Sequence, residues 1–381
     1  MRLEDVCTVF TDGDWIESKD QSEKGIRLIQ TGNIGEGLYL EKESRAKYIS
    51  EDTFKKLKCT EIFPGDILVS RLPEPIGRAC IVPERTGRMI TAVDCTICRP
   101  DETLISKEYL CYFMQSNAYY TRLLANVTGT TRKRISRKNL GNVELEVPTK
   151  EEQNTIVERL DCLVKVIDSR TKELQLLDNL IKARFVEMFG DPKYNKSDLV
   201  KIGEIGALTS GGTPSRAKPE YFEGDIRWYS AGELNSLYLP DSVEHISQMA
   251  LQQSSAKLFN KGTLMIGMYD TAAFKMGILT EDSSSNQACA NLNPRQGFNI
   301  VWLYYLFDIM KPVFLQERQG VRQKNLSLSK IKEFEVPFAP FELQNQFADF
   351  VKQVDKSKVV VQEALDKTQL LFDSLMQKYF G

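Results

Sequence analysis

Hydrophobic residues recur every seven positions in two long stretches of the chain. In residues 151–189 one column of this repeat holds Leu160, Ile167, Leu174, Ile181 and Met188, and the companion column holds Ile156, Leu163 and Leu177. In residues 341–380 the columns hold Val351, Leu365, Phe372 and Tyr379, and Phe347, Val354, Val361 and Leu375. Apolar positions at this spacing keep one helix face turned toward a partner helix. The pattern therefore predicts two coiled-coil helices that pair with each other.

Polar residues interrupt these columns at Arg170, Arg184, Lys358 and Thr368. Polar residues at seam positions cost stability but help to fix the register and the choice of partner. At about 1.5 Å per residue, each predicted helix would be about 55–60 Å long.

The region before the first long helix has a different pattern. Short strand-like runs occur at 26–29, 66–69 and 79–82, and Pro, Gly and Asn residues mark turns between them. Residues 107–124 predict a helix that lies on the resulting sheet. Residues 140–147 alternate between apolar and polar and predict a further strand. This region is expected to be an α+β domain.

The region between the two long helices repeats this scheme. Gly190-Asp191-Pro192 ends the first helix, because glycine accepts a left-handed conformation and proline cannot continue a helix. Predicted strands then occupy residues 200–208, 225–229, 262–266 and 334–336, and a predicted helix occupies residues 301–314.

An offset of 191 residues superposes parts of the two halves. It places Gln153-Asn154 on Gln344-Asn345 and Phe189-Gly190 on Phe380-Gly381. It also places Gly129, Lys133, Ser136 and Leu140 on Gly320, Lys324, Ser327 and Ile331. The sequence thus predicts an internal duplication with four segments: residues 1–149, 150–190, 191–339 and 340–381.

The amino-acid composition excludes fewer classes of function than the internal repeat does. With 42% hydrophobic and 27% charged residues and a formal net charge of −2, the chain has no global basic excess. Nucleic-acid binding must therefore be argued from local clusters. The first residues lack an apolar signal region, and the longest apolar run, residues 301–307, is too short to span a bilayer. We expect a cytoplasmic protein that does not enter a membrane.

The sequence contains no constellation of residues that indicates catalysis. Glycine-rich cofactor loops, a phosphate-binding loop and a Gly-x-Ser-x-Gly motif are missing, and His245 is the single histidine. Cys95 and Cys98 have the spacing of a metal or redox pair, but their apolar neighbours favour a buried strand. We predict no catalytic residue, no metal and no cofactor bound by this chain.

A basic cluster just before the first long helix is the most informative candidate site. Glycine, hydroxyl groups and cations together suit a phosphate backbone. Its counterpart before the second helix carries side chains that can pair with base edges. The candidate DNA-binding residues of the two clusters are Gly129, Thr130, Thr131, Arg132, Lys133, Arg134, Arg137 and Lys138, and Gly320, Arg322, Gln323, Lys324, Asn325 and Ser327. The alternative for either cluster alone is a solvated surface loop.

Several polar loops between the predicted strands are weaker candidates for DNA contact. Thr31 and Asn33 lie in the segment 30–33, Thr213 lies in Ser-Gly-Gly-Thr-Pro, and Ser230 lies in Trp-Tyr-Ser-Ala-Gly. Arg71 and Tyr269 follow the two β-rich runs that begin at Gly65 and Gly262. For each of these loops, an ordinary turn is the alternative.

The arrangement resembles the specificity subunits of Type I restriction-modification systems. The resemblance rests on the segments GTTRKRISRKNL…VPTKEEQNTIVERLD and SGGTP…GDIRWYSAGEL, and on two variable regions that are each followed by a long helix ending in Phe-Gly. It implies two target recognition domains of mixed α/β structure, related by a pseudo-twofold repeat. It also implies that the two long helices pair antiparallel, with Leu160, Ile167, Leu174, Ile181, Val354, Val361, Leu365 and Phe372 in their contact.

The resemblance further implies a non-catalytic subunit that reads a bipartite, asymmetric sequence in double-stranded DNA. Two methyltransferase subunits would dock on the helices and supply S-adenosylmethionine, and a motor-nuclease subunit would add cleavage. Two alternatives remain open at this point. One is a coiled-coil scaffold with two protein-binding domains, and the other is a restriction-like enzyme with its own activity.

Overall fold

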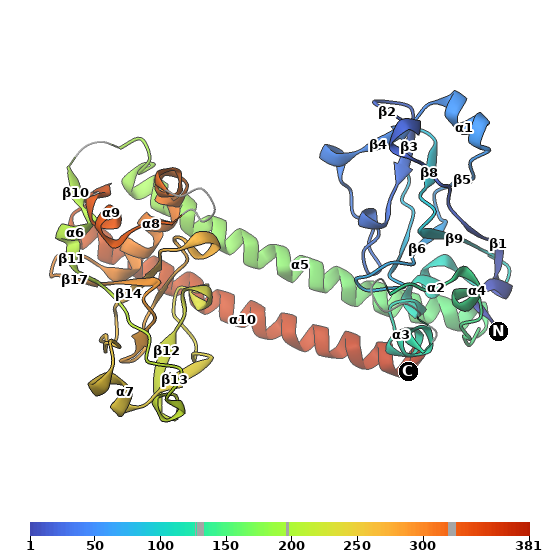
Figure 1. Ribbon diagram of the computed structural model, residues 1–381. Helices are drawn as coiled ribbons and strands as arrows, with labels where there is room; N and C mark the ends of the chain where they lie inside the picture. The colour runs from blue at the N-terminus through green and yellow to red at the C-terminus, as the bar shows by residue number, and fades with distance from the viewer. Residues whose placement is uncertain (126, 128–132, 196–197, 319–324) are drawn as a thin grey trace. The chain divides into compact units, whose positions relative to one another are not determined.

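The chain folds into two compact units. Unit 1 comprises residues 1–171 and 363–381, and unit 2 comprises residues 172–362. The structure is a computed structural model, which describes all residues except 126, 128–132, 196–197 and 319–324; its elements are labelled in Figure 1. In the described residues, unit 1 contains two sheets and unit 2 contains three, and each unit also has a helical layer, so the predicted α+β fold is confirmed.

Unit 1 is built on a four-stranded antiparallel sheet. In spatial order its strands are β1 (Cys7–Asp12), β9 (Cys95–Pro100), β6 (Ile67–Ser70) and β7 (Ala79–Ile81). Along β6, Ile67 and Val69 point into the helical layer, whereas Leu68 packs against a second sheet. Successive side chains of a strand point to opposite faces, so a central strand covered on both sides is hydrophobic throughout.

The second sheet of unit 1 has five short strands. They are β2 (Gln21–Ser22), β4 (Lys47–Ile49), β3 (Ile26–Ile29), β8 (Met89–Thr91) and β5 (Glu61–Ile62). Strands β3 and β8 pair in parallel, whereas the other neighbours are antiparallel. The short helix α1 (Glu51–Leu57) connects β4 to β5.

Two sequence predictions about the helical layer of unit 1 were wrong in detail. The helix predicted over residues 107–124 is interrupted, giving α2 (Lys107–Phe113) and α3 (Asn117–Leu124). The Ser116 side chain accepts a hydrogen bond from the Tyr119 backbone and so starts a new helix. The strand predicted over residues 140–147 begins instead inside α4 (Arg137–Gly141), and its extended part pairs with the first residues of the chain through Leu3 N to Val143 O (2.8 Å).

Unit 2 repeats the four-stranded sheet with the same strand order, and it repeats the three middle strands, β4, β3 and β8, of the five-stranded sheet. The first contains β11 (Gly206–Ser210), β17 (Cys289–Pro294), β14 (Leu264–Gly267) and β15 (Met276–Ile278). The second contains β13 (Glu244–Ile246), β12 (Ile226–Tyr229) and β16 (Ser284–Ser285). The parallel pair β12–β16 corresponds to β3–β8 of unit 1. Helix α7 (Gln248–Gln253) follows β13.

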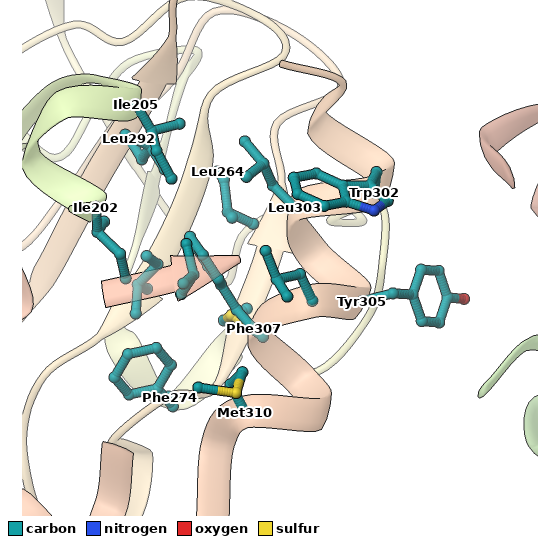
Figure 2. Packing of buried hydrophobic residues seen from close by; sticks show 14 of the residues in the cluster. Ile202, Ile205, Leu264, Phe274, Leu292, Trp302, Leu303, Tyr305, Phe307 and Met310 are labelled. Atoms are coloured by element: carbon teal, nitrogen blue, oxygen red, sulfur yellow. The ribbon is translucent and has the colours of Figure 1, made fainter. Parts of the chain in front are cut away.

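The core of unit 2 lies between this sheet and α8 (Ile300–Phe314), which begins one residue before the predicted helix. Figure 2 shows Leu264 and Leu292 of the sheet facing Leu303 and Phe307 of α8. The strand predicted over residues 200–208 was wrong, because a helical turn divides it. The observed elements there are β10 (Leu199–Lys201), α6 (Ile202–Ile205) and β11, and β10 pairs with β18 (Glu335–Pro337), which follows α9 (Leu328–Glu333).

The two long helices match the predicted ranges closely. Helix α5 covers Lys150–Phe189 and helix α10 covers Phe341–Phe380. In unit 1, Arg159 donates to the Tyr379 hydroxyl (2.9 Å), and in unit 2, Lys358 pairs with Asp178 (2.7 Å). Increasing residue numbers on α5 thus meet decreasing numbers on α10, which is an antiparallel pairing. All the predicted contact residues, Leu160, Ile167, Leu174, Ile181, Val354, Val361, Leu365 and Phe372, are buried or half-buried.

A buried glutamine ties the start of each long helix to its own domain. Gln153 accepts a hydrogen bond from the backbone of Ser106 (2.8 Å) and donates to two carbonyls, those of Leu104 and Pro148. Gln344 does the same with Asn299 N (2.8 Å), Gly297 O and Ala339 O. Both glutamines are fully buried, and both bind the residue that caps the next helix in the domain. The repeated glutamine predicted from the sequence is therefore a repeated structural joint.

The glycines that precede β6 and β14 are also equivalent. Gly65 and Gly262 have φ values of +92° and +84°, a region that favours glycine. Each donates its backbone N–H over 2.9 Å, Gly65 to Val82 O and Gly262 to Leu279 O. The turn before the central strand is thus preserved although the strands themselves differ in sequence.

Candidate nucleic-acid interface

The repeated basic loops attach to the same strand end in both units. In unit 1, Arg71 follows β6; its N–H donates to Asp94 O (2.9 Å), and its carbonyl accepts from Ile135 N (3.3 Å). In unit 2, Met268 follows β14 and makes the same two bonds, to Ala288 O (2.9 Å) and from Leu326 N (2.8 Å). Ile135 and Leu326 are separated by the 191-residue offset. The fold therefore holds both loops at equivalent places.

The serine shared by the two loops has a structural role. Ser136 accepts a hydrogen bond from Asn139 N (3.1 Å) and caps α4, and Ser327 accepts from Lys330 N (3.1 Å) and caps α9. Such caps satisfy backbone donors at a helix start. Ser327, predicted as a DNA contact, is exposed but already has this partner, so its role toward DNA stays a prediction.

In unit 1 the loop arginines are held by two aspartates. Arg134 pairs with Asp94 (3.0 Å) at a half-exposed position. Arg71, which is 5% exposed, lies 3.3 Å from Asp12 and donates to Val93 O over 2.6 Å. Burial lowers the pKa of Arg71, and the neighbouring Asp12 opposes this effect. Arg71 therefore supports the loop from beneath and does not present its side chain at the surface.

The remaining described cations of this loop are accessible. Arg137 lies 3.9 Å from Asp12 and 3.5 Å from the Thr11 hydroxyl, and its side chain is 47% exposed. Lys133 and Lys138 are exposed. An open depression is lined by Asp12, Arg137 and Lys138 together with residues near the start of the chain. Lys133 and Lys138 can approach an anionic ligand, whereas Arg137 lies within ion-pair distance of Asp12.

The corresponding part of unit 2 has Met268 in place of Arg71, and the depression beside it carries both acidic and basic side chains, including Glu317 and Lys330. Asn325 accepts a hydrogen bond from Asp270 N (3.0 Å), and Tyr269 is 40% exposed. Both line an open depression with Ser327 and Lys330. The structure thus brings three predicted residues of unit 2, Tyr269, Asn325 and Ser327, to one surface.

A second pair of loops is equivalent at an offset of 200 residues. The segments IRLIQTGN (26–33) and IRWYSAGE (226–233) each form a strand followed by a short 3-10 helix, Thr31–Asn33 or Ala231–Glu233. Asn33 accepts from Gln30 N (3.1 Å) and donates to Leu40 O (3.0 Å), and it is nearly buried. Ser230 donates its hydroxyl to Glu233 (2.6 Å). Thr31 is half-buried, and all three predicted residues lie in this pair of turns.

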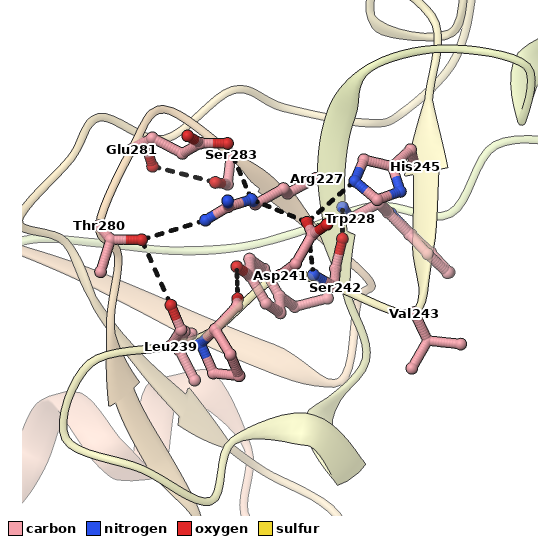
Figure 3. A network of polar contacts seen from close by, with 12 residues as sticks. Arg227, Trp228, Leu239, Asp241, Ser242, Val243, His245, Thr280, Glu281 and Ser283 are labelled. Carbon is pink, nitrogen blue, oxygen red and sulfur yellow. Dashed lines mark hydrogen bonds and ion pairs between the residues drawn. The ribbon is translucent and has the colours of Figure 1, made fainter. Parts of the chain in front are cut away.

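An arginine beneath each of these turns is anchored by an acidic residue. Arg27 is buried and lies 3.6 Å from Glu41. Arg227 binds Asp241 (2.9 Å) and Glu281 (2.8 Å), and Asp241 also contacts His245 (3.0 Å), as Figure 3 shows. Arg27 and Arg227 are 200 residues apart, and so are their acidic partners Glu41 and Asp241. Both segments contain Ile-Arg and a later Gly at the same spacing, and this repeat could have predicted that the two turns are equivalent.

The Ser-Gly-Gly-Thr-Pro segment of unit 2 is packed tightly against other backbone. A Cβ atom on Gly211 would lie 2.2 Å from Ser285 O, and one on Gly212 would lie 2.0 Å from Ser255 O. Unit 1 has the same constraint at Gly13, where a Cβ would lie 2.3 Å from Thr91 O. The predicted contact Thr213 donates its hydroxyl to Gln287 and is half-buried. Close packing explains these glycines without reference to a ligand.

Part of the predicted site lies outside the described residues. These residues are Gly129, Thr130, Thr131 and Arg132 in the first loop, and Gly320, Arg322, Gln323 and Lys324 in the second. Their role as DNA contacts stays a prediction.

The described residues add no catalytic arrangement to this picture. Over those residues, no group of three or more His, Cys, Asp or Glu side chains could hold a metal ion. Cys95 and Cys98 lie in the buried strand β9, as predicted, and burial raises the pKa of Cys95 to about 12. A thiol with such a pKa stays protonated and unreactive near neutral pH. No helix in the described part of the chain has the length and apolar character of a membrane span.

Comparison with known families gives a match over nearly the whole chain. The family model described as the Type I restriction modification DNA specificity domain matches residues 1–179 and 194–367. The MjaIX specificity subunit of Methanocaldococcus jannaschii is 29% identical over 181 residues, which cover 45% of this chain and less than half (42%) of that protein. The EcoR124I/EcoR124II specificity subunit of Escherichia coli is 20% identical over 288 residues, covering 71% of this chain and 68% of that protein.

Two solved structures share the fold. A chain from a study of complex assembly and conformational transition of a type I restriction-modification system aligns with a TM-score of 0.61 at 16% identity, covering 100% of this chain and 96% of its own length. The S subunit of the type I system from M. genitalium aligns with a TM-score of 0.55 at 16% identity, covering 100% and 95%.

Proposed function

This chain belongs to the family of Type I restriction-modification DNA specificity domains, and from that premise we propose that it reads a bipartite, asymmetric DNA sequence with one domain in each unit. It would do so as a non-catalytic subunit of a Type I restriction-modification complex. Because DNA is the proposed ligand, we place the complex in the cytoplasm.

The duplicated loop attachment carries this proposal. In each unit, a loop rich in cationic or amide side chains is bonded to the end of the central strand by the same backbone hydrogen bonds. Each loop is followed by a helix that a serine caps. Cations beside hydroxyl groups suit phosphates, and Arg, Asn and Gln suit base edges. A scaffold that binds two proteins would have no need for these side chains at both equivalent positions.

The long helices support the proposed partners. Apart from the paired seam, they carry exposed apolar side chains, which on a surface often mark protein contacts. On α5 these are Val166, Leu176, Leu180 and Val186, and on α10 they are Val359, Val360, Leu370 and Leu371. We propose that two methyltransferase subunits dock on these surfaces and bind S-adenosylmethionine themselves. A motor-nuclease subunit would join the same complex.

Methylome sequencing of a host that expresses this chain with its cognate methyltransferase subunit tests the proposal. We expect a split adenine-methylated motif. Replacing the second domain, residues 198–337, with that of a relative should change one half of the motif and leave the other half unchanged. An assembled complex without sequence-specific methylation would contradict the proposal and favour the scaffold alternative.

A DNA-binding assay separates the adaptor from the scaffold more directly. Replacing Arg132, Lys133 and Arg134 with Ala should weaken binding of the full chain to duplex DNA and reduce the salt dependence, because each lost phosphate contact lowers the slope of log K against log salt by about 0.9. Replacing Lys55, Lys56 and Lys58 near helix α1 removes the same charge and serves as the control. A scaffold would lose no DNA affinity in either variant.

A third measurement addresses an activity of the chain itself. The purified chain should transfer no methyl group from labelled S-adenosylmethionine to DNA. Transfer without partner subunits would overturn the non-catalytic assignment.

A further inference from the structure

Two carboxylates lie directly beneath the basic loop of unit 1, where a DNA-binding surface would be expected to exclude them. Asp94 pairs with Arg134, and Asp12 lies within ion-pair distance of both Arg71 and Arg137. Three positive and two negative groups therefore share one network. Its net charge is only one positive, far less than the loop sequence alone indicates.

The positions of the two aspartates are fixed by the fold. Asp12 ends β1, and Thr96 on the neighbouring strand β9 donates a hydrogen bond to it over 3.0 Å. Asp94 immediately precedes β9, and its carbonyl accepts from the Arg71 backbone. The carboxylates are therefore held by the sheet, whereas the arginines that they bind belong to, or support, the loop.

The two aspartates have no charged counterpart in unit 2. Strand pairing places Asp12 opposite Thr96 and Ser210 opposite Ala290, so Ser210 occupies the position of Asp12. Ala288 occupies the position of Asp94, because it accepts the same backbone bond, from Met268. Arg71, Arg134 and Arg137 correspond to Met268, Asn325 and Leu328 in the same way. At these equivalent, described positions the network of aspartates and arginines is present in unit 1 and absent from unit 2.

We infer that Asp12 and Asp94 are positioning residues that determine the sequence specificity of the domain in unit 1. They hold Arg134 and Arg137 in fixed directions before DNA arrives and withhold these arginines from indiscriminate phosphate contacts. This inference rests on the proposed function. A guanidinium with a fixed direction is suited to the planar pairing with a base edge that distinguishes one base pair from another. A freed guanidinium follows the phosphate backbone, which carries no sequence information.

Replacing Asp94 with Asn tests the inference, because the shape is kept while the charge is lost. Binding of the full chain to a random-sequence duplex should become tighter and more salt-dependent. One additional phosphate contact steepens the slope of log K against log salt by about 0.9, so the ratio of affinities at 50 and 200 mM salt should widen by about threefold. Asp12→Asn should act in the same direction.

The control is Glu43→Gln, which makes the same change in net charge. Glu43 pairs with Arg85 over 2.6 Å at an exposed position outside the loop network. If Glu43→Gln and Asp94→Asn change the salt dependence of binding equally, net charge alone explains the change and the inference is overturned. A second variant combines Asp94→Asn with Arg134→Gln, which removes the freed arginine and should return the slope to that of the wild type, so the test does not depend on one substitution.

Sequence discrimination gives the second readout. In the methylome assay, Asp94→Asn should relax one half of the methylated motif and leave the other half unchanged. A wild-type chain that binds no duplex and supports no methylation would refute the proposed function itself. A wild-type chain that binds and directs methylation, together with an Asp94→Asn variant of unaltered salt slope and unaltered motif, would refute only the role of the aspartates.

Discussion

Units 1 and 2 have a similar backbone arrangement, but their side chains differ at the proposed DNA-binding surface. The four-stranded sheets have the same strand order, and both loops are bonded to the end of the central strand by the same pair of backbone hydrogen bonds. At that strand end, unit 1 has buried Arg71 among aspartates, whereas unit 2 has Met268 with Ser210 and Ala288 nearby. The duplication preserved the joints and replaced the side chains around them.

Equivalent positions in a duplicated protein are therefore better identified from the residues that fix the backbone than from surface side chains. Gln153 and Gln344 are identical because each hydrogen-bonds to neighbouring backbone. Gly65 and Gly262 are identical because each has a positive φ, and Gly13 and Gly211 because a Cβ atom would meet a backbone carbonyl oxygen. The surface loops have no such confinement, so their sequences can diverge while the fold stays the same. Four experiments can break or sharpen this view.

The largest expected effect concerns the starts of the long helices, where the units differ in packing. Phe347 is fully buried, with the rings of Phe185, Phe189 and Tyr305 at 5.2, 5.9 and 5.6 Å, whereas its counterpart Ile156 is half-buried. Phe347→Ala should lower the free energy of unfolding of unit 2 by about 3–5 kcal/mol, and Ile156→Ala should lower that of unit 1 by less than about 2 kcal/mol. Hydrogen–deuterium exchange of the full chain, read by peptides from each unit, measures both. Equal losses would contradict the asymmetry.

The confined glycines should respond alike in both units. Gly13→Ala and Gly211→Ala each force a Cβ against a carbonyl oxygen, so each should cost about 1–3 kcal/mol of stability in its own unit. Gly32→Ala and Gly232→Ala are matched controls, since their Cβ atoms would meet only flexible side-chain atoms at 3.3 and 3.8 Å. Thermal melting with local hydrogen exchange provides the readout. A large loss at only one of the two confined glycines would break the equivalence.

The buried glutamines should also be equivalent. Gln153→Ala and Gln344→Ala each leave a buried backbone N–H and two carbonyls without their partner, which costs about 1–3 kcal/mol. The exposed neighbours Asn154 and Gln346 serve as controls when replaced with Ala. Urea unfolding followed by exchange in residues 104–106 and 297–299 is the appropriate measurement. No change in those segments would show that the glutamines are not joints.

The smallest effect is a pH dependence that unit 1 should show at Asp14, a position where unit 2 has glycine. Burial raises the pKa of Asp14, which accepts a hydrogen bond from Thr60 N (2.8 Å), whereas the equivalent Gly212 has no group to titrate. The folded state therefore binds this proton more tightly than the unfolded chain. The contribution of Asp14 to stability is greatest below about pH 4 and falls as the pH rises through the folded pKa.

Asp14→Asn should therefore gain stability relative to the wild type as the pH rises from about 4 toward neutrality. Melting temperatures of both proteins at a series of pH values measure this difference. A difference that is constant with pH would exclude the titration of Asp14 as its cause.

The sequence predicted those features that depend on local pattern. The seven-residue spacing located both helices, and the predicted contact residues are buried or half-buried, because periodic apolar positions need no knowledge of distant residues. The break at Ser116 and the helical turn at residues 202–205 were missed, because short caps override a continuous apolar pattern. The predicted cluster was partly located, since Arg134, Arg137 and Asn325 do lie beside the strand ends.

The remaining parts of the site depend on contacts between distant residues. Asp12 meets Arg137 only after β1 has paired with β9, and nothing in the neighbourhood of either residue indicates the other. The 200-residue offset that relates Arg27 to Arg227 was hidden by a second, different offset of 191 residues for the helices. Segments of unequal length inside the domains caused that mismatch, because the offset is 197 at Gly65 and Gly262 but already 191 at Ile135 and Leu326, before the helices begin.

The division of the chain between the units has a consequence for its synthesis. Unit 2 is one continuous stretch, residues 172–362, whereas unit 1 needs residues 363–381 to cover Leu160 and its neighbours with Met376 and Phe380. A chain emerging from the ribosome can therefore complete its second domain before its first. The usual order, in which the N-terminal domain folds first, would be reversed here. Until residues 363–381 have been synthesised, the first-made domain keeps an apolar helix face open to chaperones or to a premature partner.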